Sequence, residues 1–177
     1  MEIRERPVKS NVTPRVMSRI HHAERLVSIY GEWLDFHDCE VTSVSLDRGN
    51  HMTVVESGDW THRVAPSLTA KIMTFDYRSR DPEDRKYRLV TLLFQGINEF
   101  TMENFSYQNP VMGIGLCAEP EQGESEFRLR VEWGGTVMGH EAEFTCESIE
   151  VLAIEPFDPP GSVKANHPMQ PTAGSGG

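Results

Sequence analysis

The sequence lacks a long apolar segment. No stretch approaches the roughly 18 consecutive apolar residues that a membrane-spanning helix needs. The N-terminus, MEIRERPVKS, is charged where a signal peptide would be apolar. We therefore expect a cytoplasmic protein that does not enter a membrane.

Cysteine is also scarce. The three cysteines, Cys39, Cys117 and Cys146, are odd in number and far apart, which argues against a disulfide framework of the kind found in small secreted proteins. Cys39 and Cys146 fall inside strand-like segments, so we expect them to be buried, reduced thiols.

Positive charge is low, with 17 lysines and arginines against 27 acidic residues and a net charge of −10. The excess is concentrated between residues 119 and 158, where eleven acidic side chains accompany only Arg128 and Arg130. The electrostatic field of so many negative charges repels nucleic acid and anionic membranes and favours encounter with a basic partner. An acidic surface that only keeps the protein soluble is the alternative.

Length and composition indicate one domain with two polar ends. A chain of 177 residues is long enough for one compact core. Residues 1–14 hold two prolines, and residues 156–177 hold five prolines and close on Gly-Ser-Gly-Gly. We expect a flexible N-terminal segment (1–14), a single β-rich domain (15–155) and a disordered Pro/Gly-rich tail (156–177).

The spacing of apolar residues changes once along the chain. Over 15–30 they recur at helical spacing, which predicts one amphipathic helix that stops at Gly31. Beyond it the period is near two, and turn-forming residues separate the predicted strands 41–46, 52–55, 70–77, 87–94, 99–102, 111–116, 127–133, 141–146 and 149–154. Residues 88–94 are apolar on both faces, as expected of a central, doubly covered strand.

These elements predict a mostly β (α+β) fold. Many short strands at near-regular spacing, after one leading helix, are typical of an antiparallel β-sandwich or a strongly curved sheet. We therefore expect that architecture, preceded by one N-terminal amphipathic helix.

One cluster has side chains suited to catalysis or metal binding. His37, Asp38 and Glu40 stand together with Cys39, and imidazole, carboxylate and thiolate groups can all bind zinc. Neighbouring residues on a strand point to opposite faces, so consecutive side chains cannot converge on one ion. We predict no catalytic residue, metal or cofactor, and interpret the cluster as structural. A metal-dependent hydrolase that uses His37, Asp38 and Glu40 is the alternative.

A second candidate site lies on and just after the predicted strand 141–146. Glu141, Glu143 and Glu147 share one parity, while apolar residues occupy the other. We expect the three carboxylates on one exposed ridge and interpret it as a partner-binding surface. A solvated sheet face without a partner is the alternative.

Several short blocks from Trp33 onward occur in a characteristic order. They are Trp33, Phe36-His-Asp-Cys-Glu-Val41, Val90-Thr-Leu-Leu-Phe-Gln-Gly-Ile97, Phe105 with Asn109, Gly139 to Phe144, and Ile149-Glu-Val151. This order resembles the bacterial immunity protein 50 family, which is associated with polymorphic toxin systems. The first block departs from the family pattern at Cys39, where alanine is expected. The leading helix and the tail are expected to lie outside the resemblance.

The resemblance implies an intracellular protein that binds and neutralises a cognate toxin without catalysis. It also implies that the motif residues Trp33, Phe36, His37, Asp38 and Glu40 are structural. The acidic bias agrees with a basic, nuclease-like toxin as the partner. A β-rich adaptor or structural subunit without a toxin partner is a further alternative, and the sequence leaves the oligomeric state open.

Overall fold

The structure is a computed structural model. It describes residues 12–54, 60–75, 86–105, 109–120, 126–134 and 141–158. Most of the predicted flexible N-terminal segment (1–14) and of the predicted disordered tail (156–177) lies outside these residues.

The larger of two main sheets has six strands in the order β1-β12-β6-β5-β2-β8. They are β1 (Ile20–His21), β12 (Ser148–Pro156), β6 (Tyr87–Gln95), β5 (Ser67–Phe75), β2 (Cys39–Asp47) and β8 (Pro110–Val111). Neighbouring strands are antiparallel, except that β1 pairs in parallel with β12.

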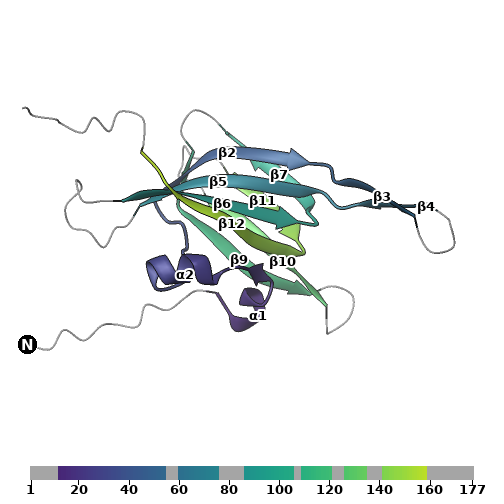
Figure 1. Ribbon diagram of the computed structural model, residues 1–177, viewed down its shortest axis with the longest axis horizontal. Coiled ribbons are helices and arrows are strands. Elements are labelled where there is room, and N and C mark those ends of the chain that lie inside the picture. The colour runs from purple at the N-terminus through teal and green to yellow at the C-terminus, as the bar shows by residue number, and fades with distance from the viewer. Residues whose placement is uncertain are drawn as a thin grey trace, which may run out of the picture.

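The smaller sheet has four antiparallel strands in the order β7-β11-β10-β9. They are β7 (Asn98–Glu103), β11 (Glu141–Cys146), β10 (Phe127–Gly134) and β9 (Gly113–Pro120). A separate pair, β3 (Asn50–Val54) and β4 (Trp60–Val64), forms an arm that continues β2 and β5 away from the two sheets (Figure 1). The strand predictions did not include β4.

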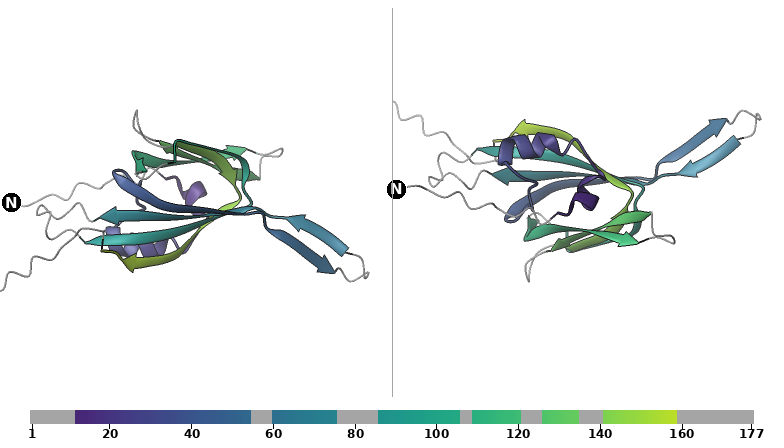
Figure 2. Two further views of the ribbon diagram at one scale, coloured as in Figure 1. Left: turned by 90° about the horizontal axis from the view of Figure 1, so that it is seen from above. Right: turned by 90° about the horizontal axis from the view of Figure 1, so that it is seen from below.

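The main core lies between the two sheets, which face each other in Figure 2. The ring of Phe94 on β6 lies 5.1 Å from that of Phe144 on β11 and 6.0 Å from that of Trp133 on β10, between centroids. Along β10 every second residue is buried, as a strand with one face on a core requires. The predicted mostly β sandwich is confirmed.

Strand β6 is central, but its two faces differ. It lies between β5 and β12. Leu92 and Phe94 are buried, whereas Leu89 and Leu93 on the opposite face are only half-buried. Thr91, on the same face as Leu89 and Leu93, is buried. Both faces of β6 are therefore covered, one of them less completely, because apolar composition alone does not tell how much of each face another layer covers.

The helix expected over 15–30 is divided. It consists of α1 (Pro14–Met17), the short strand β1 and α2 (Glu24–Tyr30). Thr13 caps α1, and α2 ends at Gly31 in the left-handed conformation (φ +83°), as predicted. The division arises because Ile20 pairs with Ile149 at the edge of β12. This pairing satisfies strand-edge groups and overrides the local helical pattern.

Two side chains of helix α2, Tyr30 and Arg25, form hydrogen bonds with the larger sheet. The Tyr30 and Thr74 hydroxyls lie 2.7 Å apart in a buried hydrogen bond. The Arg25 guanidinium donates to the carbonyl oxygens of Val151 and Leu152, at 3.0 and 2.9 Å. Together with β1, Arg25 occupies backbone groups that the edge of β12 would otherwise leave unpaired.

The described part of the chain contains no helix with the length and apolar character needed to cross a membrane.

We expect Tyr30→Phe to lower the free energy of unfolding by about 1 kcal/mol, since a buried hydrogen bond to Thr74 is lost. Urea unfolding followed by circular dichroism measures the change. In a Thr74→Val background the same substitution should cost much less, and an equal cost in both backgrounds would contradict the bond.

The three free cysteines should differ in reactivity. Burial, aided for Cys39 by Asp35 and Asp38, raises the pKa of the Cys39 and Cys146 thiols to about 12, whereas Cys117 is exposed. At pH 8 we expect Ellman's reagent to modify Cys117 alone in the native protein, and all three thiols after unfolding. Cys117→Ser is the control and should abolish native labelling; labelling of a second thiol before unfolding would contradict the buried positions.

The same two pKa values predict how stability depends on pH. In the folded protein the pKa of each buried thiol lies above the ordinary thiol pKa of about 8.5. The contribution of the two neutral thiols to the free energy of unfolding is therefore complete below about pH 8.5. This contribution should decline as the pH rises from about 8.5 toward 12.

Candidate interaction surface

The outward side of the smaller sheet carries most of its charged side chains. Strand β10 buries every second residue and presents Arg128, Arg130 and Glu132 on the other side. The acidic sheet face, as we define it, consists of Glu103, Glu119, Arg128, Arg130, Glu132, Glu141, Glu143 and Glu147. Six carboxylates against two guanidinium groups make this face strongly acidic.

Arg130 lies at the centre of this face. Its Nε donates to Glu132 Oε1 at 2.8 Å, its guanidinium also bonds Glu143, and Nη1 lies 3.8 Å from Glu119 Oε1. These carboxylates, Glu143 first, raise the pKa of Arg130 above its usual value. The contacts tie together β9, β10 and β11. Exposed ion pairs of this kind contribute little to stability, so their main effect is to order the carboxylates.

Arg128 holds Glu147 at the end of the same face. Its Nη1 lies 3.7 Å from Glu147 Oε1, and its guanidinium also donates to the carbonyl oxygen of Gly96 and to the Thr145 hydroxyl. The side chain of Glu147 is about half exposed (49%). Glu147 is therefore oriented by Arg128 while remaining accessible.

Glu141 and Glu103 lie directly opposite each other on β11 and β7. Both residues are exposed. Like charges at opposed positions of an antiparallel pair are destabilising. A cationic group bound between them would relieve that repulsion.

The alternation of residues over 141–147 predicted the exposure of three residues of the acidic sheet face. Glu141, Glu143 and Glu147 are exposed, although Thr145, which shares their parity, is buried next to a register shift in the pairing of β11 with β7. Glu103, Glu119, Glu132 and the two arginines were not among the predicted site residues. The alternation in 127–133 indicated outward charges, but which charges meet depends on strand register.

The block predicted to be structural lies at the start of β2. Trp33 and Phe36 are buried, with ring centroids 6.0 Å apart. His37 and Asp38 are exposed and pair with each other, Nδ1 to Oδ2 at 3.0 Å, and Glu40 is half-buried. Within the described ranges, no three His, Cys, Asp or Glu side chains are grouped to hold a metal ion.

We compared the chain with protein families, with curated proteins and with solved structures. Neither the curated proteins nor the solved structures yielded a match. The sequence matches the family described as Immunity protein 50 over residues 22–157. The match includes α2, which corrects the expectation that the whole leading helix lies outside the family. Because it covers most of the chain, the protein belongs to the immunity protein 50 family.

Proposed function

We propose that this protein binds and neutralises a cognate toxin of a bacterial polymorphic toxin system, in the cytoplasm and without catalysis of its own. Membership of the immunity protein 50 family supports toxin binding in general. Immunity proteins are generally non-catalytic, since neutralisation requires only that a toxin be occluded or distorted.

The acidic sheet face is the observation that carries our proposal for the binding surface. Complementary charge accelerates encounter and selects the partner. A nuclease toxin needs basic residues to hold the phosphate backbone of its substrate. A surface of ordered carboxylates such as Glu132, Glu143 and Glu147 would compete for those residues. We therefore propose a basic, nuclease-like toxin as the partner.

Protection of a cell tests the function. Expression of the toxin gene that neighbours this gene should arrest growth, and co-expression of this chain should restore it, measured as colony-forming units. Co-expression of an unrelated acidic protein of similar size is the control. Arrest that persists at equal expression levels would refute neutralisation of that toxin.

Charge reversal tests the surface. We expect Glu141→Lys, Glu143→Lys and Glu147→Lys together to slow association with the purified neighbouring toxin about tenfold or more at low salt, and to weaken its salt dependence. Surface plasmon resonance at several salt concentrations measures both quantities. Circular dichroism and urea unfolding should show that the fold is retained.

A matched control carries the same change of charge elsewhere. Glu24, Glu155 and Asp158 are also exposed, but they lie on α2 and at the end of the chain that the structure describes. Their combined replacement by lysine should slow association far less. Equal slowing by both triple variants would show that net charge matters and that the acidic sheet face does not.

A further inference from the structure

Two arginines lie against one phenylalanine ring at the end of the smaller sheet. The Cζ atoms of Arg15 and Arg19 lie 4.5 and 4.9 Å from the centroid of the Phe127 ring. Arg15 belongs to α1, which contacts β9 (Figure 1), and Phe127 is the first residue of β10. These cation–π contacts hold two positive charges close together on a chain whose net charge is −10.

The guanidinium groups of this arginine pair, Arg15 and Arg19, keep their hydrogen-bond donors available. Across the residues that the structure describes, neither group forms an ion pair or a hydrogen bond. A cation–π contact places the charge over the ring and leaves the five N–H donors of each group for other partners. Arg15 is exposed and Arg19 is half-buried, so a ligand can approach the pair from solvent.

The chemistry of the arginine pair restricts what it can bind. A guanidinium group has donors and no acceptor, so its ligand must supply acceptors, and the two oxygens of a carboxylate match its planar fork. A phosphate group or a nucleic acid offers similar oxygens but carries more negative charge. The net charge of −10 therefore repels those ligands more strongly than it repels a single carboxylate.

The arginine pair borders one end of the acidic sheet face. Phe127 is on the buried side of β10, and the next residue, Arg128, is on the outward side. Arg128 is the register partner of Glu119 and contacts Glu147. A partner that covers this end of the face therefore meets negative charge and, around the end of the sheet, two positive charges. Such a change of sign favours one orientation of the partner, because the reversed orientation would bring like charges together.

We propose that the arginine pair binds a carboxylate of the partner protein, the side chain of an aspartate or glutamate, and thereby sets the orientation of the partner on the acidic sheet face. The Phe127 ring holds both guanidinium groups before the carboxylate arrives, so less side-chain freedom is lost on binding. The carboxylate site stands on the arginine pair alone, whereas the source of the carboxylate in a toxin rests on the proposed function.

Acetate tests the carboxylate site without any toxin. Each arginine gives one Nε–H signal in a ¹⁵N-labelled NMR spectrum, and Arg15→Lys and Arg19→Lys assign the two signals by removing them. We expect sodium acetate to shift both signals in a saturable manner, and sodium chloride at the same ionic strength to have no such effect. Arg48, which is also exposed, is the internal control, and its signal should not saturate.

Three outcomes of this titration would contradict the site. The absence of a saturable shift, or equal saturation at Arg48, would refute the carboxylate site, whether or not the chain binds a toxin. Tighter binding of methyl phosphate than of acetate would refute the choice of a carboxylate. In folded Phe127→Leu, acetate should bind about threefold more weakly or worse, as the loss of a cation–π contact predicts, and unchanged binding would refute the role of the ring.

Removal of positive charge gives opposite expectations for the toxin. Arg15→Gln with Arg19→Gln makes the chain more acidic, so general attraction to a basic toxin would by itself strengthen binding. The carboxylate site predicts instead that affinity falls about tenfold or more, because charge-assisted hydrogen bonds are lost. The matched control, Arg48→Gln with Lys71→Gln, removes the same charge from exposed positions outside the site and should not lower affinity.

The possible outcomes separate the two proposals. Weaker toxin binding in the glutamate-to-lysine triple variant, with unchanged or stronger binding in the double arginine variant, would refute orientation by the arginine pair and leave the proposed function standing. Saturable acetate binding in a chain that gives no protection against the toxin would support the carboxylate site and refute the proposed function.

Discussion

Phe94 packs against Phe144 and Trp133, and this contact between the two sheets orients the rest of the structure. Burial of three large rings removes much apolar surface from water, and edge-on ring contacts add to it. Successive residues on a strand point to opposite sides. Once Trp133 and Phe144 face inward, Glu132 and Glu143 must face solvent. The acidic sheet face therefore follows from the packing of the core.

The charges on that face contribute little to folding. The carboxylates around Arg130 are exposed, and exposed ion pairs are screened by water and salt. Glu141 and Glu103 oppose each other across the pairing of β11 with β7, and like charges so placed are destabilising. The face carries six carboxylates against two guanidinium groups, and this excess negative charge is what our proposal of a basic partner rests on.

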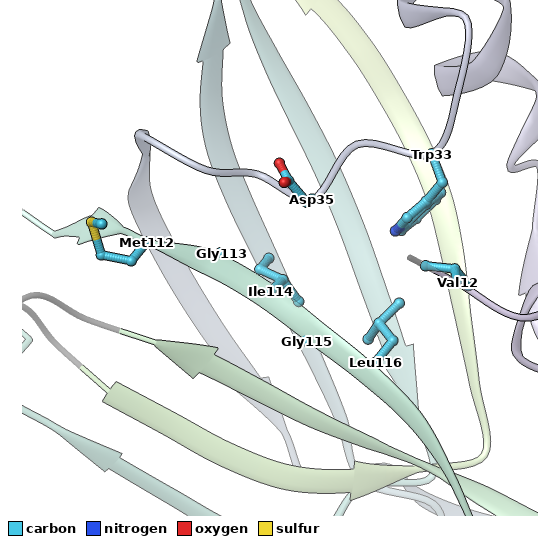
Figure 3. A pocket seen from close by; sticks show the side chains of 8 residues that line it. All are labelled: Val12, Trp33, Asp35, Met112, Gly113, Ile114, Gly115 and Leu116. Atoms are coloured by element: carbon cyan, nitrogen blue, oxygen red, sulfur yellow. The ribbon is translucent and has the colours of Figure 1, made fainter. Parts of the chain in front are cut away.

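A pocket lined by Trp33, Asp35 and residues of β9 lies beside the connector that joins α2 to β2 (Figure 3). It depends on contacts between parts of the chain that are far apart in sequence. Tyr30 anchors the end of α2 to Thr74, and the connector then runs to β9, where Asp35 accepts the Ile114 N–H. Trp33 is held between these two attachments.

Local pattern was enough to predict most of the strands, though not β1 or β4, together with the stop at Gly31 and the outward position of Glu141 and Glu143. Alternation and left-handed glycine are properties of a few consecutive residues. It could not predict the division of the helix at Ile20, which depends on Ile149 at the edge of β12. Nor could it predict which carboxylates surround Arg130 or that Trp33 borders a pocket. Those features depend on strand register and on which elements meet in space, and only the tertiary structure decides both.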